Sequence, residues 1–191
     1  MRSVKGMFLT VGALAAFTLL LLLSTAILLT QSADALSQAE LQRYNSYLLA
    51  DELRQSSDDL TRLARSYVIT GDAKYEKQYW DVLDIRNGKK ARPQDYQRIY
   101  WDFMAVDGIA PRPSEGSISL QDLMKQASFS NEEFAKLKEA QANSDDLVKS
   151  ETIAMNAVKG RFADDAGQFT KQGKPDLKRA ADLMELVNLS V

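Results

Sequence analysis

Arginine and threonine side chains at helical spacing are the first residues of this sequence that could bind a ligand. Arg54, Thr61 and Arg65 are separated by seven and four residues, which places them on one flank of a helix. Arginines on a shared flank can hold a carboxylate through paired hydrogen bonds. Acidic neighbours such as Asp58 and Asp59 leave an alternative, in which the flank faces solvent and the arginines pair with these acids.

A second group of polar residues lies in or beside apolar seams of two predicted long helices. It consists of Ser56, Ser57, Ser144 and Glu151. Buried polar groups need hydrogen-bond partners, and a neighbouring helix, a water molecule or a ligand can supply them. The alternative to ligand binding is that these residues bond between helices and fix their register. The predicted ligand-binding residues are Arg54, Ser57, Thr61, Arg65, Ser144 and Glu151.

An aromatic group offers an alternative binding site. Trp80, Tyr100 and Trp101 have acidic residues nearby, among them Asp81 and Asp102. Aromatic rings combined with carboxylates can form a cage for a cation. The competing interpretation is that these rings belong to the apolar core at the membrane-distal end of a helical bundle.

Several kinds of chemistry are disfavoured by composition. The chain has no histidine and no cysteine, so it lacks the commonest general base, the commonest metal ligand and a thiol nucleophile. No glycine-rich phosphate loop, calcium-binding loop or metal-ligand spacing is present. We therefore predict no catalytic residues, no metal and no cofactor, and we expect that the chain is not an enzyme. The net charge of −2, without a cluster of basic residues, argues against nucleic acid as a partner.

The elements that position these residues begin with an uncharged apolar segment, residues 7–30. As a helix it is about 36 Å long, enough to cross a hydrocarbon layer of about 30 Å. Arg2 and Lys5 precede it, so we expect residues 1–6 in the cytoplasm and residues 31–191 outside a single-pass inner membrane protein. The alternative is a signal peptide cleaved near Ala33-Asp34-Ala35, although the apolar run is longer than an ordinary signal core.

A long amphipathic helix is predicted to follow over residues 36–70. Its apolar seam has a period of 3.5 residues, which is typical of a helix packed lengthwise in a bundle. The seam consists of Leu49, Leu53, Ser56, Leu60, Leu63, Tyr67 and Thr70. Gly71 is expected to end this helix in the left-handed conformation, and Asp72 to cap the next one.

Shorter helices are expected over residues 75–86, over residues 93–108 and from Ser119 through Met124. A second long helix is predicted to start at the capping box of Ser130 and Glu133. Its alternating apolar pattern extends past Phe162 to Phe169, and Gly173-Lys174-Pro175 is expected to end it. A last helix is predicted over residues 177–187, and no strand pattern is recognised.

The predicted fold class is all-α. We expect a transmembrane helix continuous with an antiparallel four-helix-bundle sensor domain at residues 31–191. The fourth helix is expected to be incomplete at its C-terminal end, because no returning transmembrane segment follows it. The chain is accordingly expected to be a truncated relative of a longer receptor.

Three stretches carry a resemblance to a known family. SSDDLTRLARSYVITGD, YWDVLDIRNGKKARP and IYWDF are similar to the outer sensing region of bacterial methyl-accepting chemotaxis proteins and related membrane sensors. The similarity covers about residues 36–182. It implies a homodimeric chemotaxis receptor that binds a small molecule outside the cell and passes a helix displacement through the membrane. The same region can also precede histidine kinases or nucleotide cyclases, so the output module stays open.

The predicted function is therefore a membrane-anchored ligand-sensing domain of a chemoreceptor-type signal transducer. One alternative is the sensor region of a histidine kinase or cyclase. Another is a single-pass helical adaptor that lends its open seam to a full-length receptor.

Overall fold

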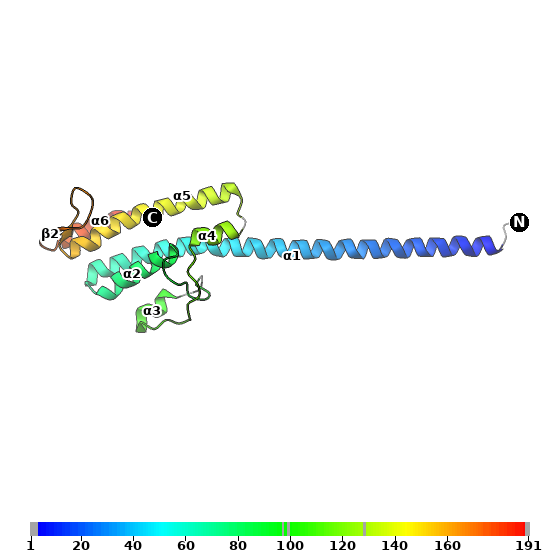
Figure 1. Ribbon diagram of the computed structural model, residues 1–191, viewed down its shortest axis with the longest axis horizontal. Coiled ribbons are helices and arrows are strands. Elements are labelled where there is room, and N and C mark those ends of the chain that lie inside the picture. The colour runs from blue at the N-terminus through cyan, green and yellow to red at the C-terminus, as the bar shows by residue number, and fades with distance from the viewer. Residues whose placement is uncertain (1–3, 97, 99, 128, 190–191) are drawn as a thin grey trace. The chain divides into compact units, whose positions relative to one another are not determined.

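A computed structural model describes residues 4–96, 98, 100–127 and 129–189 (Figure 1). The described residues form six helices and one small two-stranded sheet, so the chain is mostly helical, as predicted. The chain consists of two compact units, Met1–Tyr44 and Asn45–Val191. Of the predicted cytoplasmic segment 1–6, residues 1–3 lie outside the described residues.

The first unit consists of the N-terminal part of helix α1 (Val4–Thr70). Its apolar side chains are exposed, and by length and composition this helix could cross a membrane. The hydroxyls within residues 7–30 donate to carbonyls of their own helix, as Thr18 does to Ala15 and Ser24 to Leu21, each at 2.9 Å. Polar groups satisfied in this way suit a helix surrounded by hydrocarbon.

The second unit begins with the remainder of α1, where the predicted seam is largely confirmed. Leu53, Ser56, Leu60, Leu63 and Tyr67 are all buried. The predicted stop is confirmed as well: α1 ends at Thr70, and Gly71 adopts a φ of 67°. Asp72 caps helix α2 (Ala73–Arg86) by accepting a hydrogen bond from the Lys74 amide, so α2 begins two residues earlier than predicted.

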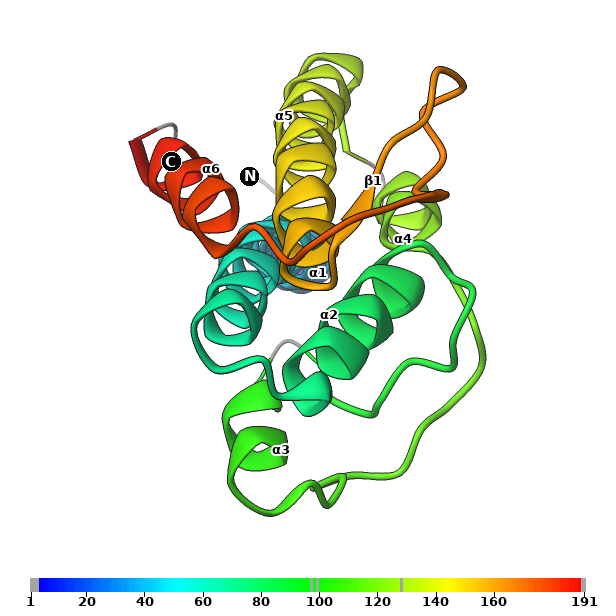
Figure 2. The ribbon, with the colours of Figure 1, turned by 90° about the vertical axis from the view of Figure 1, so that its left-hand side faces the viewer.

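Five of the described helices contribute to one hydrophobic core, α3 (Trp101–Asp107) through Trp101. α1 and α2 are joined there by helices α5 (Asn131–Val158) and α6 (Leu177–Leu189). Figure 2 shows the second unit along these axes, with α5 and α2 beside α1 and α6 next to α5. Buried members from α1, α2, α5 and α6 in turn are Leu63, Val82, Met155 and Met184. A smaller core around Leu53, Leu120 and Met124 lies beneath helix α4 (Leu120–Gln126).

Two predicted helix starts are confirmed by their caps. Ser119 accepts a hydrogen bond from the Asp122 amide at the start of α4. The Ser130 side chain and Glu133 form the expected capping box of α5, each accepting from the other's backbone amide. These caps satisfy amide groups that the first helical turn leaves without a carbonyl partner.

The prediction of a helix over residues 93–108 is wrong in its first half. Helix α3 covers only Trp101–Asp107. Pro93 instead forms a bridge with Ser114, and the Gln94 amide donates to the Pro113 carbonyl at 2.9 Å. Arg92 and Gln94 therefore bond to a returning loop around Ser114, which takes hydrogen bonds that a helix would have used, and residues 94–96 form a turn.

The second long helix is also shorter than predicted. α5 ends at Val158, and Gly160 turns the chain with a φ of 66°. A Cβ added to Gly160 would lie 2.3 Å from the Gly173 carbonyl oxygen, so this position suits glycine. A hairpin follows, in which β1 (Arg161–Phe162) pairs antiparallel with β2 (Lys171–Gln172). The expectation that no strand occurs is wrong at this point, whereas the final helix α6 is confirmed.

Candidate functional site

A buried carboxylate joins three helices of the core. Glu151 on α5 is only 1% exposed. Its two oxygens accept hydrogen bonds from the Thr61 hydroxyl of α1 at 2.7 Å and from the Tyr79 hydroxyl of α2 at 2.9 Å. Burial raises the pKa of Glu151 above its ordinary value, while both hydrogen bonds and the charges of Arg86 and Arg65 oppose that rise. The site therefore fixes α1, α2 and α5 relative to one another.

A buried arginine makes the next connection. Arg86, at the end of α2, is 2% exposed and donates to the Ser144 hydroxyl at 2.9 Å and to the Asp145 carboxylate at 2.7 Å. The Ser144 hydroxyl in turn donates to that of Ser57 at 3.1 Å. Burial lowers the pKa of the Arg86 guanidinium, and the Asp145 charge opposes this. We refer to these seven residues as the polar network: Ser57, Thr61, Tyr79, Arg86, Ser144, Asp145 and Glu151.

The structure brings together four of the six predicted binding residues, since Ser57, Thr61, Ser144 and Glu151 all belong to the polar network. They bond to protein partners on other helices, which is the alternative that the sequence left open. Tyr79 and Arg86 were not predicted as members. The sequence shows Arg86 only as the last residue before a turn, and nothing in that position signals its burial.

The two predicted arginines differ in burial: Arg54 is exposed, whereas part of the Arg65 side chain is buried. Arg54 has a side chain that is 63% exposed, and its guanidinium contacts Asp51 at 2.9 Å and Asp58 at 2.8 Å. The Nε of Arg65 is buried and has no hydrogen-bond partner among the described residues. Arg54 thus pairs with acids on its own helix, and a carboxylate clamp formed with Arg65 stays a prediction.

The predicted aromatic cage is divided between two groups of rings. Trp80 packs edge-on against Tyr79, with ring centroids 5.1 Å apart. Tyr100 and Trp101 pack edge-on at the same distance, and both contact Tyr96. The Trp101 indole donates to the Tyr96 hydroxyl at 2.7 Å. Tyr100 and Trp101 therefore share a site to which Trp80 does not contribute.

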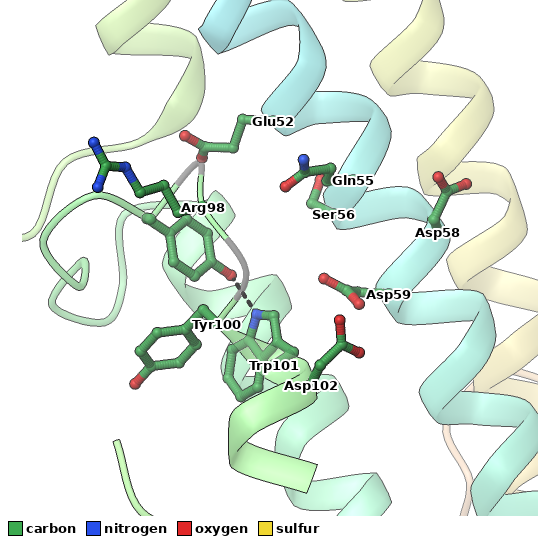
Figure 3. A pocket seen from close by; sticks show the side chains of 10 residues that line it. Glu52, Gln55, Ser56, Asp58, Asp59, Arg98, Tyr100, Trp101 and Asp102 are labelled. Atoms are coloured by element: carbon green, nitrogen blue, oxygen red, sulfur yellow. Dashed lines mark hydrogen bonds between the residues drawn. The ribbon is translucent and has the colours of Figure 1, made fainter. Parts of the chain in front are cut away.

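That second group of rings forms one wall of a pocket in the second unit. The pocket has a volume of about 170 Å³. The opposite wall comes from α1, so the two walls are far apart in sequence, and Figure 3 shows the labelled side chains around the space between them. The lining residues are Glu52, Gln55, Ser56, Asp58, Asp59, Tyr96, Arg98, Tyr100, Trp101 and Asp102.

The charge of this pocket is predominantly negative. Burial raises the pKa of Asp59, the hydrogen bond from Arg62 opposes the rise, and the nearby charge of Asp102 adds to it. Arg62 contacts both carboxylates, Asp59 at 2.7 Å and Asp102 at 3.6 Å. Burial likewise raises the pKa of Glu52, which is paired with Arg92. The sequence suggests Asp58 and Asp59 only as partners of arginines and Asp102 only as a neighbour of the aromatic residues, because it does not reveal that these two stretches line one pocket.

No protein-family model matches the chain, and no curated protein or solved structure shows significant similarity to it.

Proposed function

We propose that this chain is the membrane-anchored, ligand-sensing part of a chemoreceptor-type signal transducer. Residues 7–30 are its anchor in the inner membrane, and residues 31–191 lie outside. The observation that carries the proposal is the pocket of about 170 Å³, half of whose lining residues belong to α1. The same helix contains the apolar segment, so a ligand in the pocket would contact the helix that enters the membrane.

The residues that carry the resemblance to chemotaxis receptors support this proposal by their positions. Asp58 and Asp59 from the first motif line the pocket, as do Tyr100, Trp101 and Asp102 from the third. The remaining motif residues include core members, among them Leu60, Leu63, Val82 and Ile85. The residues of these motifs therefore contribute both to the hydrophobic core and to the lining of the pocket.

The helical arrangement supports a sensor of the bundle type. We propose that α1, α2, α5 and α6 form an antiparallel four-helix bundle in which two copies of the chain associate as a homodimer. The polar network holds α1 against α2 and α5 at defined register, since each of its hydrogen bonds requires one axial position. Ligand binding is then expected to favour one axial position of α1 over another, and α1 would relay this displacement inward.

The experiment is a ligand screen on the full chain in lipid nanodiscs, monitored by tryptophan fluorescence during thermal unfolding. Trp80 and Trp101 are the two tryptophans, and both belong to the second unit. A ligand that binds only the folded state raises the Tm, and the increase grows with the logarithm of its concentration once this exceeds the Kd. We expect at least one small metabolite to raise it in the wild type and not in Gln55→Trp, which fills the pocket.

The matched control is Asn143→Trp, which places the same ring on the exposed face of α5, away from the pocket, and should retain the response. If no compound of a broad metabolite library changes the Tm of the wild type, the sensing function is wrong. A response that is equally strong in Gln55→Trp would show that the ligand binds elsewhere.

A further inference from the structure

The pocket between α1 and the wall of Tyr96, Arg98, Tyr100, Trp101 and Asp102 has a predominantly acidic lining. Four carboxylates and one arginine are among its lining residues. Glu52 is matched by Arg92, but Asp59 and Asp102 share the single guanidinium of Arg62. The Asp59–Asp102 pair therefore has one negative charge without a partner of its own. A ligand with one positive charge would balance it.

Some hydrogen-bond acceptors among the lining residues have no donor within the described part of the chain. The Asp102 side chain is 70% exposed and contacts Arg62 only at 3.6 Å, without a hydrogen bond to any described residue. Gln55 donates its amide to Asp51 at 3.0 Å, and within the described part of the chain its carbonyl oxygen accepts no hydrogen bond. Together with the Asp59 carboxylate these groups offer acceptors for three N–H donors, the number that a primary ammonium carries.

The aromatic wall provides a surface for the rest of the ligand. Arg92 lies over the Tyr96 ring at 5.4 Å and Arg112 over the Tyr100 ring at 6.0 Å. Trp101 has no cationic side chain over its ring among the described residues, and its indole lines the pocket, so it offers apolar contact to a ligand. A volume of about 170 Å³ is close to that of an engineered cavity of about 150 Å³ that binds benzene, so the ligand should have about six to ten non-hydrogen atoms.

We propose that this pocket binds a small primary amine as its protonated monocation. Asp59, Asp102 and Gln55 accept hydrogen bonds from the ammonium group, and Trp101 contacts the hydrocarbon part. The proposal rests on the proposed sensing function and names the class of ligand for it. It differs from the anionic ligand that the predicted arginine clamp would require.

The test compares three probes that share one hydrocarbon skeleton. Isopentylamine is the cation, isopentanol is the neutral analogue, and leucine adds a carboxylate to the amine. Binding to the full chain in nanodiscs is measured by calorimetry at neutral pH and moderate salt. We expect isopentylamine to bind at least tenfold more tightly than either analogue, because isopentanol lacks the charge and the carboxylate of leucine faces an acidic wall.

Two substitutions are expected to act in opposite directions. Asp102→Asn removes the unbalanced charge while leaving the Asp59–Arg62 pair intact, and should weaken isopentylamine binding by about tenfold. Arg62→Gln frees both carboxylates and should strengthen it. Asp146→Asn, on the exposed face of α5, is the matched control and should have no effect. A purely structural disturbance would weaken binding in both pocket variants.

Tighter binding of leucine or isopentanol than of isopentylamine would overturn the amine proposal. Loss of binding in both Asp102→Asn and Arg62→Gln would overturn it as well. If isopentylamine fails while another compound of the metabolite library raises the Tm, the ligand class is wrong and the sensing function stands. If no compound of the library raises the Tm, the sensing function itself is wrong.

Discussion

Replacement of Arg86 by methionine tests whether the polar network holds the second unit together. The side chain of Arg86 is almost fully buried, and it is the network's connection between the end of α2 and the middle of α5. Methionine retains most of the apolar contact made by the arginine stem and removes only the guanidinium. The substitution therefore isolates the contribution of the guanidinium's charge and hydrogen bonds to the free energy of unfolding.

The expected loss follows from the partners of the guanidinium. The hydrogen bond to Ser144 is charge-assisted and buried, and a bond of this kind contributes about 1.5–3 kcal/mol. The Asp145 side chain is half exposed, so its pairing with Arg86 is screened by solvent and adds at most about 1 kcal/mol. Loss of the positive charge also leaves Glu151 less well compensated. We expect a destabilisation of about 2–3 kcal/mol.

For a unit of this size, about 2–3 kcal/mol corresponds to a decrease in Tm of about 4–12 °C. The assay is thermal unfolding of the full chain in nanodiscs, followed by fluorescence of Trp80 and Trp101. Arg54→Met is the matched control, because Arg54 is also a helical arginine paired with acids but lies on the surface. Its Tm should stay within about 2 °C of the wild type. Equal shifts in the two variants would refute a structural role for the polar network.

Three further predictions concern a buried acid, a turn and the membrane segment. Because burial raises the folded-state pKa of Glu151, its contribution to stability is complete below its unfolded pKa of about 4.5 and is lost as pH rises through the folded value. Thermal unfolding of Glu151→Gln between pH 4 and 8 should therefore show a smaller decrease in stability with rising pH than the wild type; an equal decrease would contradict this. Gly160→Ala should lower the Tm by several degrees, since its Cβ meets a carbonyl at 2.3 Å, whereas Gly116→Ala, with open space around it, should not. The chain has no cysteine, so Leu19→Cys introduces a single exposed thiol into the apolar segment. In membranes, disulfide formation between two copies of Leu19→Cys should change in rate when a pocket ligand is added, and an unchanged rate would contradict displacement of α1.

The parts of the fold that local sequence determines could be predicted. The seam of α1, the glycine stop at Gly71 and the cap at Ser130 each depend on residues within one or two helical turns. Such features are visible as spacing and residue type. The pattern of α5 was also correct as far as Val158.

The errors arose where contacts distant in sequence outweighed local spacing. The apolar positions of Phe162 and Phe169 continue the helical period of α5, yet the chain turns at Gly160 because the Gly173 carbonyl takes the place of a side chain there. The apolar spacing after Pro93 also suits a helix, but Pro93 and Gln94 pair with the loop around Ser114. Neither partner can be identified from a single sequence.

In the candidate site, too, features set by local sequence could be predicted and those set by distant contacts could not. Polar residues in an apolar seam indicated Ser144 and Glu151 correctly as unusual positions, because burial requires that such groups be paired. Spacing alone does not tell whether the partner is a ligand or another helix. The pocket was harder to recognise, since Asp59 on α1 and Asp102 on α3 are far apart in sequence and come together only in the folded chain, where Arg62 contacts both.

The polar network and the pocket lie on adjoining stretches of α1, and under the proposed sensing function this proximity would link ligand binding to the position of the helix. Asp59 faces the pocket, and Thr61, two residues later, bonds to Glu151 of α5. A helix displaced along its axis moves both side chains together, because the rise per residue is fixed at about 1.5 Å. The hydrogen bond between Thr61 and Glu151 is 2.7 Å long and weakens steeply when stretched, so a shift of about one residue's rise would break it. A ligand that draws Asp59 toward Asp102 would therefore either leave the bond between Thr61 and Glu151 in place or replace it with a different hydrogen bond. Each of these two hydrogen-bond arrangements would correspond to one discrete position of α1.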